Sequence, residues 1–337
     1  MEFDPAIALE YAQRISRPRQ VGSKEEKIVA QEIKAQLEGS GFRVNFQTFR
    51  FSTASEVFLF LEILSGLAII ISTLLALGIN PWLTSIQSGL LVFLIIVIGP
   101  LNNKVQCGSL KCSQDQPQTW WSSVCWKLGR CYETKNIIAT LPDSSTDPSL
   151  PHLYLLAHYD SKSQYLPLVV RIALFVMLIA GSLIFAGLTM LSTFNAPLTP
   201  LSLAIGILVI LSGIPLLFLD YGNDSPGAID DASGVGLVLH LAETIAKSPQ
   251  INQKLGISLL ITSAEELAVK GAQAYIMENE SYLRSCAGGS GLNVLNFDGI
   301  GGDGKIHLVG GSKGSSISTG DNLISLLRQS AEELGIP

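Results

Sequence analysis

The stretch HLYLLAHYD, residues 152–160, is an apolar run that closes on two possible metal ligands. Two further apolar runs, ISLLITSA at residues 257–264 and LNVLNF at residues 292–297, are each followed by carboxylates. The side chains that close the three runs are His158, Asp160, Glu265, Glu266 and Asp298. An open α/β sheet gathers its functional groups where its strands end. The sequence therefore predicts an α/β fold with a mostly parallel mixed sheet, helices on both faces and a site at the strand ends.

A fourth stretch, GAIDDASGVG at residues 227–236, places Asp230 and Asp231 before a helical pattern. Ser233 and Gly234 lead into apolar residues with helical spacing, namely Val235, Leu239, Leu241 and Ile245. A carboxylate at the start of this segment can bridge two cations.

The spacing within each motif indicates which side chains could act together. Residues two apart on a strand face the same way, so Asp160 can orient the His158 ring. Glu265 and Glu266 leave their strand in different directions, which allows one carboxylate to hold a metal while the other takes a proton from metal-bound water.

Each motif also has a plainer interpretation. Acidic residues at strand ends are common solvated loop residues, and Glu265 with Glu266 could instead favour the N-terminus of a helix LAVKGAQAYIM, residues 267–277, through its dipole. Four such motifs in one chain favour a shared zinc hydrolase site over four separate structural roles.

Taken together, the motifs AHYDS, GAIDDASGVG, SAEELAVKGAQAYI and LNFDGIGG resemble metallopeptidase family 28, the zinc aminopeptidases and carboxypeptidases that also include glutaminyl cyclases. The stretch PRQVGSKEEKIVAQEIKAQLEGSGFRV, residues 18–44, is similar to the opening helix and first strand of that family. The resemblance implies a peptidase fold over the soluble parts of the chain.

The resemblance also implies roles for individual residues. His158, Asp230 and Asp298 would surround one zinc, and Asp230 with Glu266 would surround a second, so that Asp230 bridges the two ions. Glu265 would be the general base and Asp160 would orient His158. A cis peptide bond between Asp230 and Asp231 is a further implication.

One ligand of the family pattern is missing. The second zinc of the family takes a histidine well downstream of the Asp298 position, and His152, His240 and His307 are poor substitutes. The abrupt ending at Pro337 leads us to expect that the chain is C-terminally incomplete. A glutaminyl-cyclase-like acyl transfer, which uses one zinc, therefore stays open.

Composition predicts a membrane protein. The chain is 47% hydrophobic and 15% charged, with a mean hydropathy of +0.38. The excess lies in four apolar blocks of about the length that a membrane-spanning helix needs, at residues 57–79, 83–101, 166–191 and 198–219. We expect a discontinuous zinc peptidase domain at residues 1–55, 132–165 and 220–337. The first transmembrane hairpin would span residues 57–101, a Cys- and Trp-rich insert residues 102–131, and the second transmembrane hairpin residues 166–219.

The two hairpins predict the membrane topology. Their outer turns lie near Asn80–Trp82 and Ser192–Pro197, so every soluble segment returns to one side of the bilayer. The outer turns contain no Lys or Arg, whereas the domain side places Arg50, Lys104, Lys111 and Lys162 near the span ends. By the positive-inside rule, the catalytic domain faces the cytoplasm.

The insert carries Cys107, Cys112, Cys125 and Cys131, with Trp120, Trp121 and Trp126. These thiols could hold a structural zinc, form two disulfides or stay reduced, since their spacing matches no strong zinc signature. The tryptophans favour an interfacial patch at the lipid headgroups.

The sequence thus predicts an integral, multi-pass membrane zinc exopeptidase, an aminopeptidase that hydrolyses N-terminal peptide bonds. Its partners would be a peptide substrate and the lipid bilayer; the formal net charge of −6 and the scattered basic residues argue against nucleic acid. A non-catalytic membrane scaffold and a glutaminyl-cyclase-like acyltransferase are the alternatives. Nothing in the sequence indicates the oligomeric state or the preferred substrate side chain.

Overall fold

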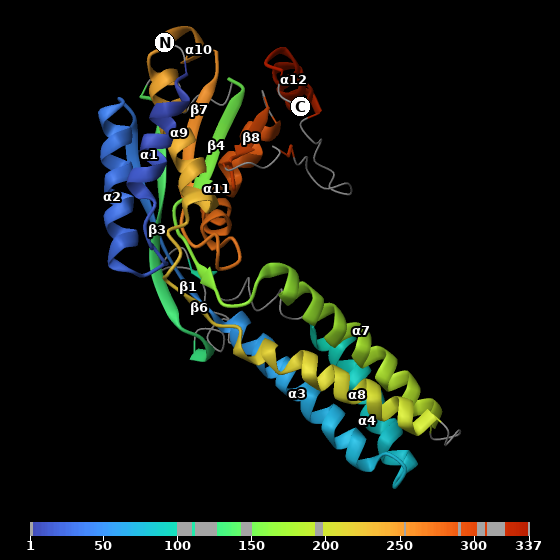
Figure 1. Ribbon diagram of the computed structural model, residues 1–337. Coiled ribbons are helices and arrows are strands. Elements are labelled where there is room, and N and C mark those ends of the chain that lie inside the picture. Colours follow the sequence, from blue (N-terminus) through green and yellow to red (C-terminus); the bar gives the residue numbers. More distant parts are fainter. Residues whose placement is uncertain are drawn as a thin grey trace. The chain divides into compact units, whose positions relative to one another are not determined.

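The computed structural model of the chain divides it into two compact units (Figure 1). The first unit comprises Met1–Phe49, Glu133–Lys162 and Asn223–Pro337, and the second comprises Arg50–Tyr132 and Ser163–Gly222. The structure describes residues 3–99, 110–111, 127–142, 150–192, 198–252, 254–288, 291–301, 307–308 and 321–335.

The first unit is built on a mixed β-sheet. Its strands are β1 (Arg43–Ser52), β3 (Cys131–Thr140), β4 (His152–His158), β7 (Gly256–Thr262) and β8 (Leu292–Asn296), in the spatial order β1-β3-β7-β4-β8. Strand β4 pairs in parallel with both β7 and β8, whereas β3 runs antiparallel to β7. The carboxyl ends of β7, β4 and β8 therefore lie side by side at one edge of the sheet.

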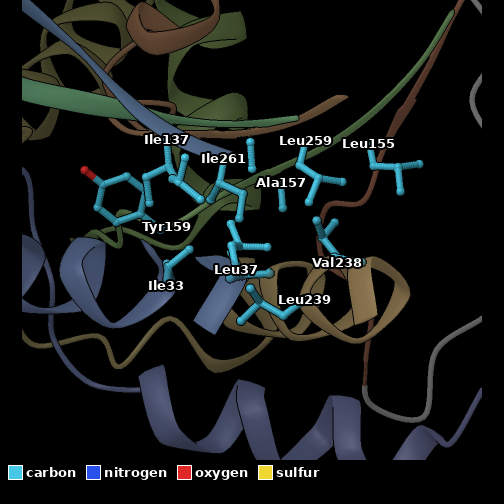
Figure 2. Packing of buried hydrophobic residues seen from close by; sticks show 14 of the residues in the cluster. Ile33, Leu37, Ile137, Leu155, Ala157, Tyr159, Val238, Leu239, Leu259 and Ile261 are labelled. Atoms are coloured by element: carbon cyan, nitrogen blue, oxygen red, sulfur yellow. The ribbon is translucent and has the colours of Figure 1, made fainter. Parts of the chain in front are cut away.

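Helices cover both faces of this sheet. On one face, α1 (Pro5–Ile15), α2 (Lys24–Gly39) and α9 (Ser233–Ala246) pack together over the main core. Figure 2 shows side chains of α2 and α9 meeting those of the sheet. The labelled residues are Ile33, Leu37, Val238 and Leu239 from the helices, Ile137, Leu155, Ala157, Leu259 and Ile261 from the strands, and Tyr159 directly after β4. On the other face, Tyr275 of α11 (Lys270–Gly288) packs with Tyr154 and Leu260. All seven residues of β7 are buried, as a strand covered on both faces requires.

Local signals explain where the helices begin. Asp4 accepts a hydrogen bond from the backbone N–H of Ala6 and precedes Pro5, and Ser23 accepts one from Glu26 N–H. Helix α11 starts at Lys270, three residues later than the apolar pattern from Leu267 predicts. The reason is local, because Ala268 and Val269 adopt left-handed backbone conformations with φ of 69° and 58°. Short helices α10 (Pro249–Asn252) and α12 (Asp321–Glu333) complete the first unit.

Four long apolar helices form the second unit. They are α3 (Ala54–Ala76), α4 (Pro81–Phe93) with the π-helical turn η1 (Leu94–Ile98), α7 (Leu168–Ser192), and α8 (Thr199–Gly213) with the 3-10 turn η4 (Pro215–Phe218). By length and composition, each of these four is a candidate membrane span. Short strands accompany them: β2 (Leu110–Lys111) pairs with Arg50 and Phe51, the end of β1 that belongs to the second unit, and β5 (Ser163–Gln164) pairs with β6 (Tyr221–Gly222).

Small and hydroxyl residues lie among the buried apolar side chains in the interior of the helical unit. The hydroxyls of Ser88 and Thr189 lie 2.6 Å apart between α4 and α7, and a Cβ added at Gly206 would come within 2.8 Å of Phe185. Many large apolar side chains are exposed, among them Val169 and Phe218 at 79% and 74%. Membrane helices pack in this way, because lipid rather than water surrounds their apolar faces.

Several predicted features lie outside the described residues. These are Cys107, Cys112, Cys125, the three tryptophans of the insert, Lys104 and most of the turn at Ser192–Pro197. Of the remaining cysteines, Cys131 opens β3 and Cys286 is buried in α11.

Candidate metal centre

Three predicted ligands meet at the edge of the first unit's sheet. His158 is the last residue of β4, Asp298 follows β8 by two residues, and Asp230 lies in the turn η5 (Ala228–Ala232) that precedes α9. Ligand atoms of the three residues all lie within 4.8 Å of one another. One imidazole and two carboxylates form a donor set that suits zinc, so the residues present fit the predicted metal.

The His158 ring is fixed between two carboxylates. Its Nε2 lies 2.9 Å from Asp230 Oδ1, and its Nδ1 lies 3.4 Å from Asp160 Oδ1. Burial opposes the protonated ring, but the carboxylates of Asp160 and Asp230 outweigh burial and raise the pKa of His158 to about 11. The surroundings of this ring are thus arranged to hold positive charge.

Asp160 links the histidine to the segment that carries the two glutamates. The Asp160 side chain is fully buried, and its carboxylate accepts hydrogen bonds from the backbone N–H groups of Glu265, at 3.1 Å, and Glu266, at 3.3 Å. The spacing of the AHYD motif predicts an orienting contact with His158. The additional contact with residues 265 and 266 depends on tertiary structure, so a local motif could not predict it.

Asp231 has a structural part in the site that the sequence motif did not suggest. Its buried carboxylate accepts from His158 N–H and Gly234 N–H, each at 3.0 Å, and so ties the end of β4 to the start of α9. Burial raises the pKa of Asp231 to about 7. A Cβ at Gly234 would come within 2.3 Å of Asp231 Oδ1, which explains the glycine. The Asp230–Asp231 peptide bond is cis, as the family resemblance implies.

The adjacent glutamates lie in different environments. Glu265 Oε2 is 3.9 Å from His158 Nε2, and burial raises the pKa of Glu265. Burial, with a further contribution from Asp230, raises the pKa of Glu266 to about 7. Among the described residues, the three-residue ligand cluster does not include Glu266, although its carboxylate lies in the electrostatic field of Asp230.

A buried arginine, Arg19, holds together two segments that carry residues of the site. Arg19 donates from Nε to Tyr159 O, at 2.6 Å, and from its terminal nitrogens to the carbonyls of Pro226 and Gly227. Burial lowers its pKa to about 10, so the guanidinium remains charged at neutral pH. Arg19 thereby connects the end of β4 with the turn before Asp230. In the sequence, Arg19 lies in the stretch PRQVGS, residues 18–23, which resembles the opening of the family fold and does not mark Arg19 as part of the site.

The other histidines lie apart from the ligand cluster in the described structure. His152 is buried at the start of β4, His240 accepts from Asp4 N–H through Nε2 at 2.9 Å, and His307 is exposed. None of the three joins His158 in the described ligand cluster.

The chain is similar to several proteins of known structure. No curated protein matches it. It is 15% identical to a glutaminyl cyclase from Bacteroides thetaiotaomicron, covering 100% of this chain and 74% of that one with a TM-score of 0.47. It is also 15% identical to a leucine aminopeptidase precursor from the same organism, covering 100% and 75% with a TM-score of 0.48. A Zn-dependent exopeptidase from Parabacteroides distasonis is 15% identical, with coverage of 79% and 48% and a TM-score of 0.35. These likenesses bear on neither substrate nor mechanism.

A match to a protein family is more informative than these structures. Residues 136–336, which hold every predicted metal ligand with Asp160 and Glu265, match peptidase family M28. Because the match covers more than half of the chain, the chain belongs to peptidase family M28.

Proposed function

We propose that the chain is a membrane-anchored, zinc-dependent exopeptidase that removes residues from the N-terminus of peptides. The observation that carries this proposal is the meeting of His158, Asp230 and Asp298 within 4.8 Å of one another, with Glu265 Oε2 3.9 Å from His158 Nε2. A general base next to a ligand set is what hydrolysis by an activated water requires.

The proposed roles combine this geometry with the residue roles that the family resemblance implies. Zinc, when bound, supplies a Lewis acid that polarises the substrate carbonyl and lowers the pKa of water. His158, Asp230 and Asp298 would hold one ion, and Asp230 with Glu266 would hold a second. Glu265 accepts the proton of the attacking water and passes it to the leaving amine, and its raised pKa suits both transfers. Asp160 keeps the His158 ring in place.

Zinc analysis tests the ligand assignment. We expect purified full-length protein to contain zinc, and a His158→Ala, Asp298→Ala double variant to lose it. Both proteins carry serine in place of Cys107, Cys112, Cys125 and Cys131, so that thiol-bound zinc is excluded. The control is a His307→Ala, Glu280→Ala variant, which removes an exposed histidine and an exposed carboxylate. Equal zinc in the double variant and the parent would refute the assignment.

The reaction is tested with one peptide that begins with glutamine. Aminopeptidase activity releases free glutamine and a shortened peptide, whereas a cyclase releases ammonia and leaves the peptide at full length. We expect shortening, and we expect N-acetylation of the peptide to abolish it. Zinc binding without either product would favour a non-catalytic scaffold.

Cysteine labelling tests the proposed topology, in which both hairpins cross the membrane and the catalytic domain faces the cytoplasm. In a cysteine-free background, single cysteines at positions 80 and 195 should be labelled from the outer face. A cysteine at the exposed position 280 of α11 should be labelled only from the cytoplasmic face. An even number of crossings separates His158 from Asp230, so labelling of positions 80 and 195 from opposite faces would contradict the model of two hairpins.

A further inference from the structure

A further carboxylate, Glu26, is buried in the first unit and takes no part in the ligand cluster. Only 1% of Glu26 is exposed, although it lies in the first turn of α2. Its Oε1 accepts hydrogen bonds from the hydroxyls of Thr134 and Ser263, and its Oε2 accepts from Gly22 N–H at 2.6 Å. Capping of α2 accounts for the bond to Gly22 but not for the two bonds that reach β3 and the end of β7.

Ser263 connects Glu26 to the site. The Ser263 hydroxyl donates to Glu26 Oε1 at 2.7 Å, and this serine stands two residues before Glu265. Its backbone N–H donates to Asn136 Oδ1 at 3.2 Å, and Asn136 Nδ2 donates to Gly271 O at 2.8 Å. The segment that presents Glu265 and Glu266 is therefore held at both of its ends by buried polar side chains.

This segment needs such support because its backbone is strained. Three residues other than glycine adopt the left-handed region: Ala264, Ala268 and Val269, with φ of 57°, 69° and 58°. Such conformations are unfavourable and persist only when the surrounding structure fixes them. A β-branched residue such as Val269 is especially disfavoured there. Hydrogen bonds to a buried carboxylate are among the strongest anchors that a protein can provide.

We propose that Glu26 is a positioning residue, which fixes through Ser263 the strained segment that presents Glu265 and Glu266 to the metal centre. The proposal rests on the proposed function for its effect on turnover, but not for its effect on the segment itself. Glu26 contacts none of His158, Asp230 and Asp298 in the described hydrogen bonds. Its loss should therefore disturb the base and leave this ligand cluster in place.

The test compares Glu26→Gln with Glu243→Gln. Glutamine at position 26 keeps the size of the side chain but turns an N–H donor toward Gly22 N–H or toward the two hydroxyls. Glu243 is the matched control, because it also accepts hydrogen bonds from a hydroxyl and an amide, those of Tyr11 and Gln36. It lies in α9 ten residues after Ser233, about 15 Å along the helix at the usual rise. Both variants lose comparable local contacts.

Two readouts are measured for each variant. Amide hydrogen exchange at Glu265 and Glu266, whose N–H groups bond to Asp160, should accelerate in Glu26→Gln and stay unchanged in Glu243→Gln. For Glu26→Gln, kcat should fall by about 10- to 100-fold with little change in KM, as expected for a catalytic group displaced by about 1 Å, while zinc at the His158 cluster is retained.

Each outcome decides the proposal. Unchanged amide exchange in Glu26→Gln, or the same acceleration in Glu243→Gln, overturns the positioning role. A wild-type protein without turnover would contradict the proposed function, whereas amide exchange would still test the positioning role. If Glu26→Gln does not fold, Ser263→Ala removes only the hydroxyl between the carboxylate and the segment, and the same exchange pattern is expected.

Discussion

Glu265→Gln is expected to lower kcat by a factor on the order of 100 or more while the protein keeps its zinc. The amide has nearly the same shape as the carboxylate but cannot accept a proton, so the loss reports on proton transfer rather than on packing. Glu265 Oε2 lies 3.9 Å from His158 Nε2, close to the ligand cluster but outside it. Burial raises the pKa of Glu265, which brings the group nearer to the value that suits a base at neutral pH.

Glu266→Gln should have the opposite signature. Because Glu266 is proposed as a zinc ligand with Asp230, its replacement should lower the zinc content, and activity should fall in proportion to the zinc that is lost. Elemental analysis and steady-state kinetics on the same preparations separate the two variants. Glu280→Gln, an exposed glutamate of α11 that pairs with Arg284, is the control and should change neither quantity. Zinc loss from Glu265→Gln with retention in Glu266→Gln would show that the two roles are exchanged.

The strand ends could be predicted from the sequence because one physical rule governs them. Apolar runs that end in His158 and Asp298 become β4 and β8, and these strands are parallel neighbours. The side chains that follow the two runs therefore lie close together, as the position of the runs in the sequence predicts. The four apolar blocks could be predicted for a similar reason, since a helix of membrane length needs an unbroken run of apolar residues. The structure contains a helix at each block.

The supporting residues could not be predicted in this way. Arg19 donates to carbonyls more than 200 residues away in the sequence, at Pro226 and Gly227, and Glu26 accepts from Ser263, which is 237 residues away. Nothing in the local pattern around these residues distinguishes a buried charge from a solvated one. The late start of α11 could not be predicted either, because Val269 adopts a left-handed conformation that a β-branched side chain disfavours.

Arg19→Met is expected to lower the free energy of unfolding of the first unit by about 3 kcal/mol or more. Methionine fills much of the same space but donates no hydrogen bond. The carbonyls of Tyr159 and Gly227, both in buried residues, would then lose a charged donor. Each buried carbonyl left without a partner costs about 1–3 kcal/mol. The carbonyl of the exposed Pro226 can bond to water instead, so we assign it a smaller share.

Two further variants separate geometry from charge in this prediction. Arg19→Lys keeps the positive charge but lacks the planar fork that reaches several carbonyls at once, so it should recover only part of the lost stability. Arg17→Met, two residues earlier, removes a partly exposed ion pair with Glu32 and should cost no more than about 1 kcal/mol. Urea titration followed by pulse proteolysis measures all three on zinc-free protein. If Arg19→Met is no less stable than Arg17→Met, the buried guanidinium does not hold β4 to the turn before Asp230, and its hydrogen bonds are replaced by water at little cost.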